Sequence, residues 1–249
     1  GGLTVALLSA SVVLLAGSTV GSARAALTYY SENYGAQVEV SKIGVSLEES
    51  NDKGKSYTKI SKRNYISNGK WDEATGDLLT GLKEEKIVPG KQYDEALKVT
   101  NSGSIDSYVR VIIKKSWTDK EGVKDTTLSP DLIDLNLNLK EGSGWVIDKN
   151  ASTKERTILY YTGILPAGKS TPALSNTLTI DKSIATKVTQ DVKEEDGYKT
   201  ITTTYAYDGY NFQLEAEADA VQTHNAQDAI KSAWGVDVDV DGNGNISLR

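Results

Sequence analysis

The C-terminal string DVDVDGNGNISLR holds the one set of residues in the chain with the spacing of a metal site. Counted from Asp239, residues Asp239, Asp241 and Asn243 stand at positions 1, 3 and 5 of an EF-hand-type calcium loop, and Gly244 stands at position 6. Such a loop takes a bidentate Glu at position 12, and no Glu follows before Arg249. The same string fits a β-hairpin that turns at Gly-Asn-Gly. We predict the hairpin, with weak calcium binding at its turn as a hypothesis that calorimetry at millimolar calcium tests.

Catalytic side chains are scarce. The chain has one His and no Cys, which excludes thiol nucleophiles, disulfides and most His-based catalytic groups. His224 has no G-x-S-x-G elbow and no H-E-x-x-H motif with which to act. The simpler interpretation is a polar residue just before a helix. We therefore expect a protein that is not an enzyme and has no cofactor, calcium excepted.

The net charge of the chain indicates which kinds of partner it is able to bind. The chain has 34 acidic and 28 basic residues and a net charge of −6, and no basic stripe appears in it. Nucleic acid binding depends on clustered Lys and Arg that neutralise phosphates. Nucleic acid is therefore not an expected partner.

The first 25 residues differ in character from the rest. They carry no charge before Arg24, and their most apolar part, Leu3 to Ala16, has the length of a signal-peptide core, about 7–15 residues, and is shorter than a membrane helix of about 20. The small-x-small pattern at residues 23–25 predicts cleavage after Ala25. The alternative is a retained hydrophobic arm buried in a neighbouring subunit. With cleavage, the chain meets a membrane only during export.

The chain behind residue 25 alternates apolar and polar residues with a period of two, as strands with one buried face do. The clearest row runs from Phe212 to Ala220 in NFQLEAEADAV. One-sided alternation is typical of antiparallel sheets. It predicts an all-β fold, a jelly-roll-like antiparallel β-sandwich with one or two short helices and an N-terminal arm. Further rows run through Tyr93, Glu95, Leu97 and Val99, through Val109, Val111 and Ile113 (with Ile112 blurring the opposite face), through Leu174, Leu178 and Ile180, and through Ile201, Thr203, Tyr205 and Tyr207.

About 224 residues suit one large all-β domain, so we predict a single domain over 26–249. The polar stretch 48–70 and the segment 184–197 break the alternation of the strands and are interpreted as loops or excursions from this one domain, not as linkers. A short helix is predicted at Ser129-Pro130-Asp131, where a capping Ser precedes Pro at the first helical position. A second helix is predicted from a capping Asn225 to Gly235, with Trp234 anchoring its apolar stripe against the sandwich.

The segment LTYYSENYGAQVEV follows the predicted cleavage site and is aromatic and strand-prone. A strand-prone segment at a free terminus is able to pair with an exposed sheet edge. We therefore predict a donor strand at about 26–40. Its predicted interface residues are Leu27, Tyr29, Tyr30, Tyr34, Val38 and Val40.

Four blocks of the chain, in order, resemble the TasA/camelysin family, which Gram-positive bacteria secrete through a dedicated signal peptidase. The blocks are the signal-type segment with ALTYYSENYGAQVEVSKIGVSLEES, then VTNSGSIDSYVRVIIKKSW, YYTGILPAGKSTPALSNTLTI and EAEADAVQTHNAQDAIKSAWGVDV. The resemblance implies a jelly-roll subunit of extracellular biofilm-matrix fibres, in which the N-terminal strand of one subunit completes a sheet of the next. The expected partner is the chain itself, in a head-to-tail homopolymer at the cell surface, with an anchoring or minor subunit as a further partner.

Two other functions remain open. Camelysin has been described as a surface metalloprotease, but the sequence holds no zinc-protease motif that would carry this activity over. A monomeric sandwich that binds carbohydrate or a host molecule would use exposed aromatic residues such as Tyr205, Tyr207 and Tyr210.

Overall fold

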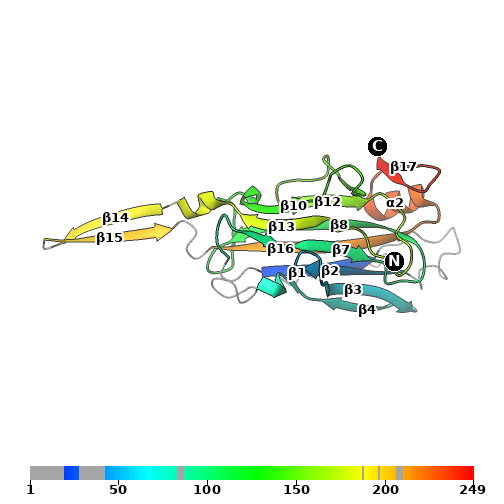
Figure 1. Ribbon diagram of the computed structural model, residues 1–249, viewed down its shortest axis with the longest axis horizontal. Coiled ribbons are helices and arrows are strands. Elements are labelled where there is room, and N and C mark those ends of the chain that lie inside the picture. Colours follow the sequence, from blue (N-terminus) through cyan, green and yellow to red (C-terminus); the bar gives the residue numbers. More distant parts are fainter. Residues whose placement is uncertain (1–19, 28–42, 83–86, 187, 196, 206–209) are drawn as a thin grey trace, which may run out of the picture.

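The protein is an antiparallel β-sandwich. The computed structural model describes residues 20–27, 43–82, 87–186, 188–195, 197–205 and 210–249. Within these ranges most of the chain is strand, with one α-helix and three short 3-10 helices (Figure 1). The predicted fold class, an all-β jelly-roll-like sandwich with short helices, is confirmed.

The largest sheet has seven strands in the order β11-β12-β8-β16-β1-β5, with β9 paired to β8. Its centre is the long antiparallel pair of β8 and β16, which is in register over twelve residues of each strand. The bounds are β1 Val20–Leu27, β5 Asp77–Leu78, β8 Ser107–Thr118, β9 Lys124–Asp125, β11 Trp145–Ile147, β12 Arg156–Tyr161 and β16 Asn211–Gln222.

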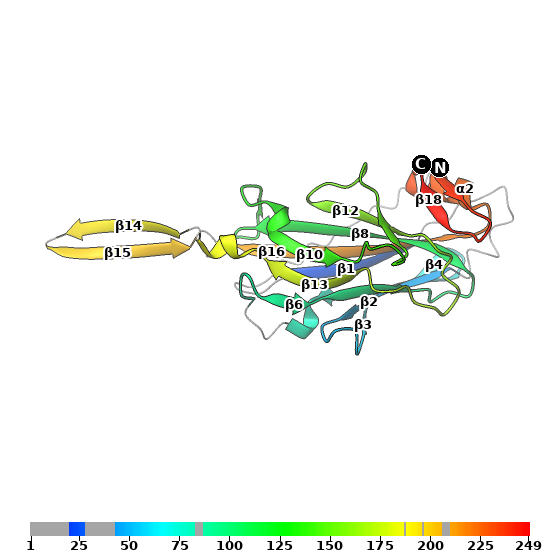
Figure 2. The same cartoon turned by 45° about the horizontal axis from the view of Figure 1, so that its top comes forward.

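The second layer consists of a four-stranded sheet, β4-β3-β2-β7, and a three-stranded sheet, β10-β13-β6. Two hairpins, β14-β15 and β17-β18, complete the strands (Figure 2). The bounds are β2 Gly44–Ser50, β3 Thr58–Ser67, β4 Lys70–Thr75, β6 Gln92–Asp94, β7 Ala96–Thr100, β10 Ile133–Leu137, β13 Ser175–Ile180, β14 Val188–Glu195, β15 Tyr198–Tyr205, β17 Val238–Val240 and β18 Ile246–Leu248. The 3-10 helices are η1 Thr80–Leu82, η2 Pro130–Leu132 and η3 Lys182–Thr186.

The main core lies between the large sheet and the two smaller ones. The predicted row Val109, Val111 and Ile113 of β8 is fully buried in it, and so is the row of β16 from Phe212 to Ala220. Ile112 belongs to a second apolar cluster on the outer face of the large sheet, where α2 (Ala226–Trp234) packs. Both faces of β8 are therefore covered, which explains why its alternation is blurred at Ile112.

The predicted helices are present, with one correction. Ser129 caps η2 and accepts a hydrogen bond from the backbone N–H of Asp131. In α2 the anchor Trp234 is 9% exposed and its ring lies 5.6 Å from that of Tyr160. Asn225 precedes α2 in a left-handed conformation and its side chain makes no capping hydrogen bond, so the predicted side-chain cap is wrong. Gly235 ends the helix in a left-handed conformation, as predicted.

The two segments interpreted as loops contain strands. In the stretch 48–70, β2 continues to Ser50 and β3 begins at Thr58, pairing with both β2 and β4. The segment 184–197 contains β14, which pairs with β15 to form a hairpin that projects from the sandwich (Figure 1). The sequence of β14, VTQDVKEE, holds only two apolar residues, so period-two counting did not identify it. Its partner β15 lies on the predicted row through Ile201, Thr203 and Tyr205.

Candidate functional site

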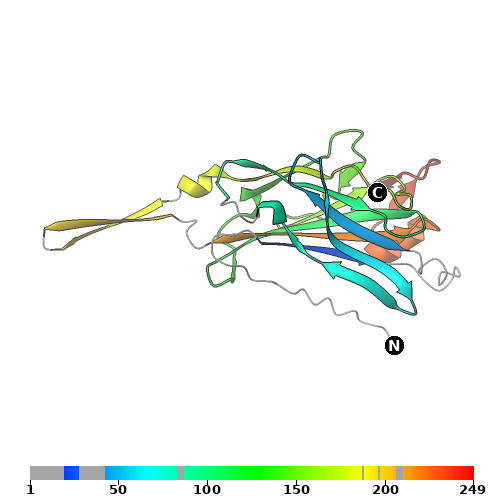
Figure 3. The same cartoon turned by 60° about the horizontal axis from the view of Figure 1, so that its bottom comes forward.

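The strand nearest the start of the chain, β1, lies inside the large sheet, between β16 and β5. It pairs in parallel with β16 along its whole length, from Val20 opposite Gln213 to Leu27 opposite Ala220. Every other strand pairing that the structure describes is antiparallel. On its other side β1 pairs with β5 through Gly21 and Ser22. Figure 3 shows β1, in dark blue, running beside the orange β16. We call this place between β16 and β5 the β1 position.

The predicted cleavage site falls inside β1. Ala25 is opposite Ala218 and Ala26 is opposite Asp219, so the bond between them joins the sixth and seventh residues of the eight-residue strand. Residues 1–19 of the predicted signal segment, and 28–40 of the predicted donor segment, lie outside the described residues. Of the predicted interface residues, Leu27 is the last residue of β1; Tyr29, Tyr30, Tyr34, Val38 and Val40 lie outside the described part of the chain.

On the inner face of β16, beside the β1 position, the size of the side chains decreases along the strand. It carries large side chains at Phe212 and Leu214, and then only methyl groups at Ala216, Ala218 and Ala220. All five residues are buried, at 2% exposure or less. In the register, Gly21, Ala23, Ala25 and Leu27 of β1 are the partners of Leu214, Ala216, Ala218 and Ala220. Three of these four residues of β1 are Gly or Ala.

A short segment closes the far side of the β1 position. β5 ends at Leu78, and Leu79, which is 1% exposed, has a φ of 61°, a left-handed conformation that costs free energy in a non-glycine residue. The backbone N–H of Leu79 donates to Oε2 of Glu49 over 2.7 Å. The next turn is held by Asn51, whose Oδ1 accepts from the N–H of Gly81 over 3.3 Å. Polar side chains from the end of β2 therefore fix the conformation of this segment.

Glu49 meets a second buried acid behind that segment. Glu95, between β6 and β7, is fully buried, and Glu49 is 3% exposed. Asn51 donates to Oε2 of Glu95 over 2.9 Å. Burial, followed by the hydrogen bond and the charge of Glu49, raises the pKa of Glu95 well above its ordinary value. The Oε1 atoms of both acids are buried and have no hydrogen-bond partner among the described residues. Bringing two carboxyl groups together in a buried site favours the uncharged form of Glu95.

One feature of the sequence indicates this acid pair. Glu95 stands in the predicted inward row between Tyr93 and Leu97. An acid in an apolar row requires a buried partner. The identity of that partner depends on the pairing of β7 with β2, which places Glu49 opposite Leu97.

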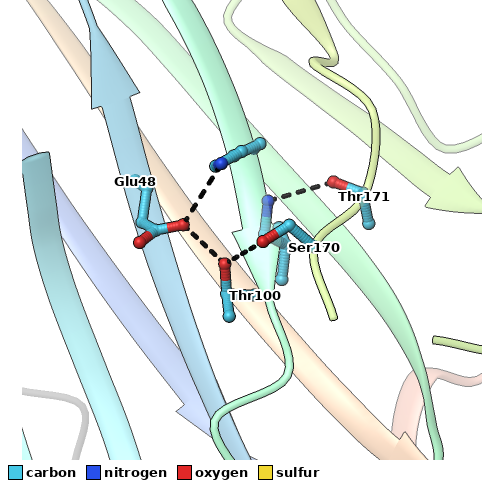
Figure 4. A network of polar contacts seen from close by, with 6 residues as sticks. Glu48, Thr100, Ser170 and Thr171 are labelled. Carbon is cyan, nitrogen blue, oxygen red and sulfur yellow. Dashed lines mark hydrogen bonds and ion pairs between the residues drawn. The ribbon is translucent and has the colours of Figure 1, made fainter. Parts of the chain in front are cut away.

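The edge of the four-stranded sheet at β7 is covered by residues 170–175. Val99 N–H donates to Thr171 Oγ1 over 3.0 Å, and Thr171 N–H donates to Val99 O over 2.8 Å. Next to them Thr100 Oγ1 donates to Glu48 Oε2 over 2.5 Å and lies 2.6 Å from Ser170 Oγ (Figure 4). This edge is satisfied by hydroxyl groups and backbone of the same chain, so it offers no row of free backbone groups to another strand.

The C-terminal string forms the predicted hairpin, in which Val238 pairs with Leu248 and Val240 with Ile246. Oδ1 of Asp241 accepts from the N–H groups of Asn243 and Asn245 over 2.8 and 2.9 Å. These hydrogen bonds lower the pKa of Asp241. Asp239 is paired with Arg249 over 2.7 Å. Calcium binding at Asp239, Asp241 and Asn243 stays a prediction; calcium would compete there with the bonds that shape the turn.

The other residues named as candidates in the sequence do not form a common site among the described residues. His224 is exposed, just before α2, and Tyr210 is packed at the margin of the main core. Tyr205 is the last residue of β15, and Tyr207 lies outside the described residues. Within the described ranges, no three His, Asp or Glu side chains come close enough together to hold a metal ion. The described helices include none long and apolar enough to span a membrane.

Together these features define a class of protein: an antiparallel β-sandwich whose largest sheet takes in, by parallel pairing, a strand from the start of the chain. Comparison with protein-family models found no match, and a search of curated proteins found no relative.

Proposed function

We propose that the chain is a structural subunit of an extracellular bacterial filament that assembles by donor-strand complementation. The observation that carries this proposal is the β1 position. A strand from the start of the chain is inserted between β16 and β5, remote from both in sequence, with a parallel partner in an otherwise antiparallel sandwich. The resemblance to the TasA/camelysin family supports the same function, and predicts export and a location in the surface matrix.

The energetics favour a filled β1 position. Without β1, the sheet would present one edge of β16 and the paired groups of β5 with no backbone partners. Each net backbone hydrogen bond contributes about 0.5–1.5 kcal/mol, and each unmet buried group costs about 1–3 kcal/mol. A strand supplied by a neighbouring copy would satisfy these groups. Head-to-tail exchange is heterologous, so it continues into a filament and does not close as a dimer. It would also hold together a protein that has no disulfides.

The test compares the chain that starts at Ala26, the expected secreted form, with one that starts at Ser41 and so lacks the predicted donor strand. The longer chain should form filaments, seen by negative-stain electron microscopy and by sedimentation. The shorter chain should stay monomeric in size-exclusion chromatography. Filaments of the same form from the shorter chain contradict the proposal.

Point substitutions in the longer chain sharpen the test. Val38 and Val40 alternate with Gln37 and Glu39. Val38→Asp should abolish filaments, because it places a charge in the row that a donor strand buries. Gln37→Asp, which adds the same charge to the opposite row, should leave them. If both variants assemble equally well, the segment is not a donor strand.

The surface metalloprotease remains as an alternative. It would be favoured by metal-dependent proteolysis that persists through repurification and disappears in His224→Ala. A monomer at every concentration and pH would instead favour the ligand-binding sandwich.

A further inference from the structure

We propose that Glu49, Asn51 and Glu95 form a pH-sensitive latch on the segment 77–82, which comprises β5 and η1. The latch holds this segment against the sandwich in acid and lets it open locally as the pH rises. Opening uncovers part of the main core, while the two layers of the sandwich stay together. This motion takes place within one subunit and does not depend on the filament function.

The contacts of the latch join three parts of the chain. Glu49, at the end of β2, accepts from the backbone N–H of Leu79 through Oε2 over 2.7 Å. Asn51 accepts from the N–H of Gly81 through Oδ1 over 3.3 Å and donates to Oε2 of Glu95 over 2.9 Å. The segment is therefore bound to one acid directly and to the other through Asn51.

Asn51 also fits closely against the backbone of the segment. A Cβ atom added at Gly81 would lie 2.6 Å from Oδ1 and 3.0 Å from Cβ of Asn51. On its other side Asn51 donates to the backbone oxygen of Asp94 over 2.9 Å. Because Asn51 is held on both sides, a movement at Glu95 changes its contact with the turn at Gly81.

The segment itself is held by few backbone groups. β5 is two residues long and pairs with β1 at two positions. Leu79 has a φ of 61°, a left-handed conformation that costs free energy in a non-glycine residue. In opposition to this strain, Leu78, Leu79 and Leu82 are buried in the main core. The closed segment is therefore favoured, and a change in the latch alters the small fraction of molecules in which it is open.

The two carboxyl groups make the latch sensitive to pH. Glu95 is fully buried and Glu49 is 3% exposed, and Oε1 of each has no hydrogen-bond partner among the described residues. Burial, and then the hydrogen bond and the charge of Glu49, raise the pKa of Glu95 well above its ordinary value, and a weaker effect of Asn51 lowers it. The closed state therefore retains a proton that the open state, with Glu95 in water, releases.

Other charged side chains lie on the elements around the two acids. Of all these charges, only that of Glu49 acts on the pKa of Glu95. The pH response of the latch therefore depends on the two acids themselves. The other charged residues on the end of β2, the turn behind it, the start of β3 and the strands β5, β6 and β7 are Glu48, Asp52, Lys53, Lys55, Lys59, Asp77, Asp94 and Lys98.

The raised pKa sets the direction of the response. Below a pH of about 4.3, the ordinary pKa of Glu, Glu95 is protonated in both states and the latch is complete. As the pH rises above this value, the ratio of open to closed molecules should grow by up to about tenfold for each pH unit, until the folded-state pKa of Glu95 is reached.

Hydrogen exchange of backbone amides in the full chain, followed by NMR between pH 5.5 and 8, tests the latch. After correction for the intrinsic exchange rate, the amides of Leu79 and Gly81 should lose protection by up to about tenfold per pH unit. The amides of the β8–β16 pair should exchange more slowly at every pH, because they open only with the whole protein. Equal protection in the two places would show that the segment 77–82 does not open by itself, which overturns the inference.

Glu95→Gln should remove the pH dependence at Leu79 and Gly81, because glutamine keeps the size of the side chain and does not ionise. The matched control is Glu155→Gln, which neutralises an exposed acid paired with Lys124 and should leave the pH dependence unchanged. If protection in Glu95→Gln falls with pH as it does in the parent chain, the acid pair does not control the segment and the inference is wrong.

Glu49→Gln is the second variant, and it serves as the test if Glu95→Gln does not fold. It keeps an acceptor for the N–H of Leu79 but removes the charge beside Glu95. The loss of protection should therefore move to lower pH. An unchanged pH response in Glu49→Gln contradicts the proposal.

Gly81→Ala tests the fit of Asn51. The added Cβ displaces Asn51, so the amide of Leu79 should exchange faster at every pH. The matched control is Gly242→Ala, where a Cβ has open space around it, and this variant should exchange like the parent chain. Equal exchange at Leu79 in the two variants would show that Asn51 does not hold the segment, and the latch would be wrong.

Discussion

Two places in the sandwich bury carboxyl groups in opposite ways. On the outer face of the large sheet, Asp219 is paired with Arg110 over 2.7 Å, and their side chains are 3% and 15% exposed. Arg110 also stacks on Trp234, with its guanidinium carbon 5.2 Å from the ring centre. Behind β5, Glu49 and Glu95 are buried against each other with Asn51 as their neighbour. The first site pairs its carboxylate with a cation, whereas the second, where two acids meet, favours the uncharged form of Glu95.

The difference determines how each site responds to its surroundings. A buried ion pair is stable over a wide pH range but leaves an unpaired charge if either partner is removed. An acid whose pKa is raised by burial and by a neighbouring acid changes its charge as the pH rises, so the second site depends on pH. Because Glu49 also binds the N–H of Leu79, the state of the acid pair affects the segment that bounds the β1 position.

The largest effect is expected from Arg110→Met, which removes the guanidinium paired with the buried Asp219. Removing one partner of a buried pair typically costs about 3–5 kcal/mol, and we expect a loss of that size in the free energy of unfolding, measured with urea. The double variant Arg110→Met with Asp219→Leu should recover most of the loss, because apolar replacement of both partners is often neutral. Equal losses in the single and double variants would mean that Arg110 stabilises the fold by packing alone.

A smaller, pH-dependent effect is expected from Glu95→Gln. Because the folded-state pKa of Glu95 is raised, the native state binds more protons than the unfolded state above a pH of about 4.3, the ordinary pKa of Glu. The stability is complete below that pH and falls as the pH rises toward the folded-state pKa, by up to about 1.4 kcal/mol per pH unit. Glu95→Gln keeps the hydrogen bonds and should remove this slope in unfolding experiments between pH 4 and 8.

The matched control is Glu155→Gln, which neutralises an exposed acid paired with Lys124 and should leave the slope unchanged. If Glu95→Gln and the parent chain lose stability equally as the pH rises, Glu95 is not protonated in the folded protein.

The smallest effect is expected at the surface pair Lys62–Asp72, which joins β3 to β4 over 2.6 Å with both side chains partly exposed. Exposed pairs contribute about 0–1 kcal/mol, so Lys62→Met should change the free energy of unfolding by less than about 1 kcal/mol. The change should shrink further in high salt. A loss as large as that of Arg110→Met would show that the difference in burial between Asp72 and Asp219 does not determine how much each ion pair stabilises the fold.

The sequence by itself determined the features that depend on near neighbours. The rows of β8, β13 and β16, the helix α2 with Trp234, and the C-terminal hairpin all follow from periodicities of a few residues, because a strand or helix with one buried face repeats its apolar side chains at a fixed spacing. The interpretation of 48–70 and 184–197 as loops or excursions missed the strands β3 and β14, whose segments hold no clear apolar row. The strand β15, in contrast, lies on a predicted row.

Only the tertiary structure decided which distant segments meet. Val20–Leu27 beside β16, and Glu49 against Glu95, are pairings between parts of the chain that no local pattern links. Strand register is set by backbone hydrogen bonds between segments remote in sequence, and these groups are the same in every residue except proline. Composition and spacing therefore indicate that a side chain is buried, while the partner it is buried against follows from the fold.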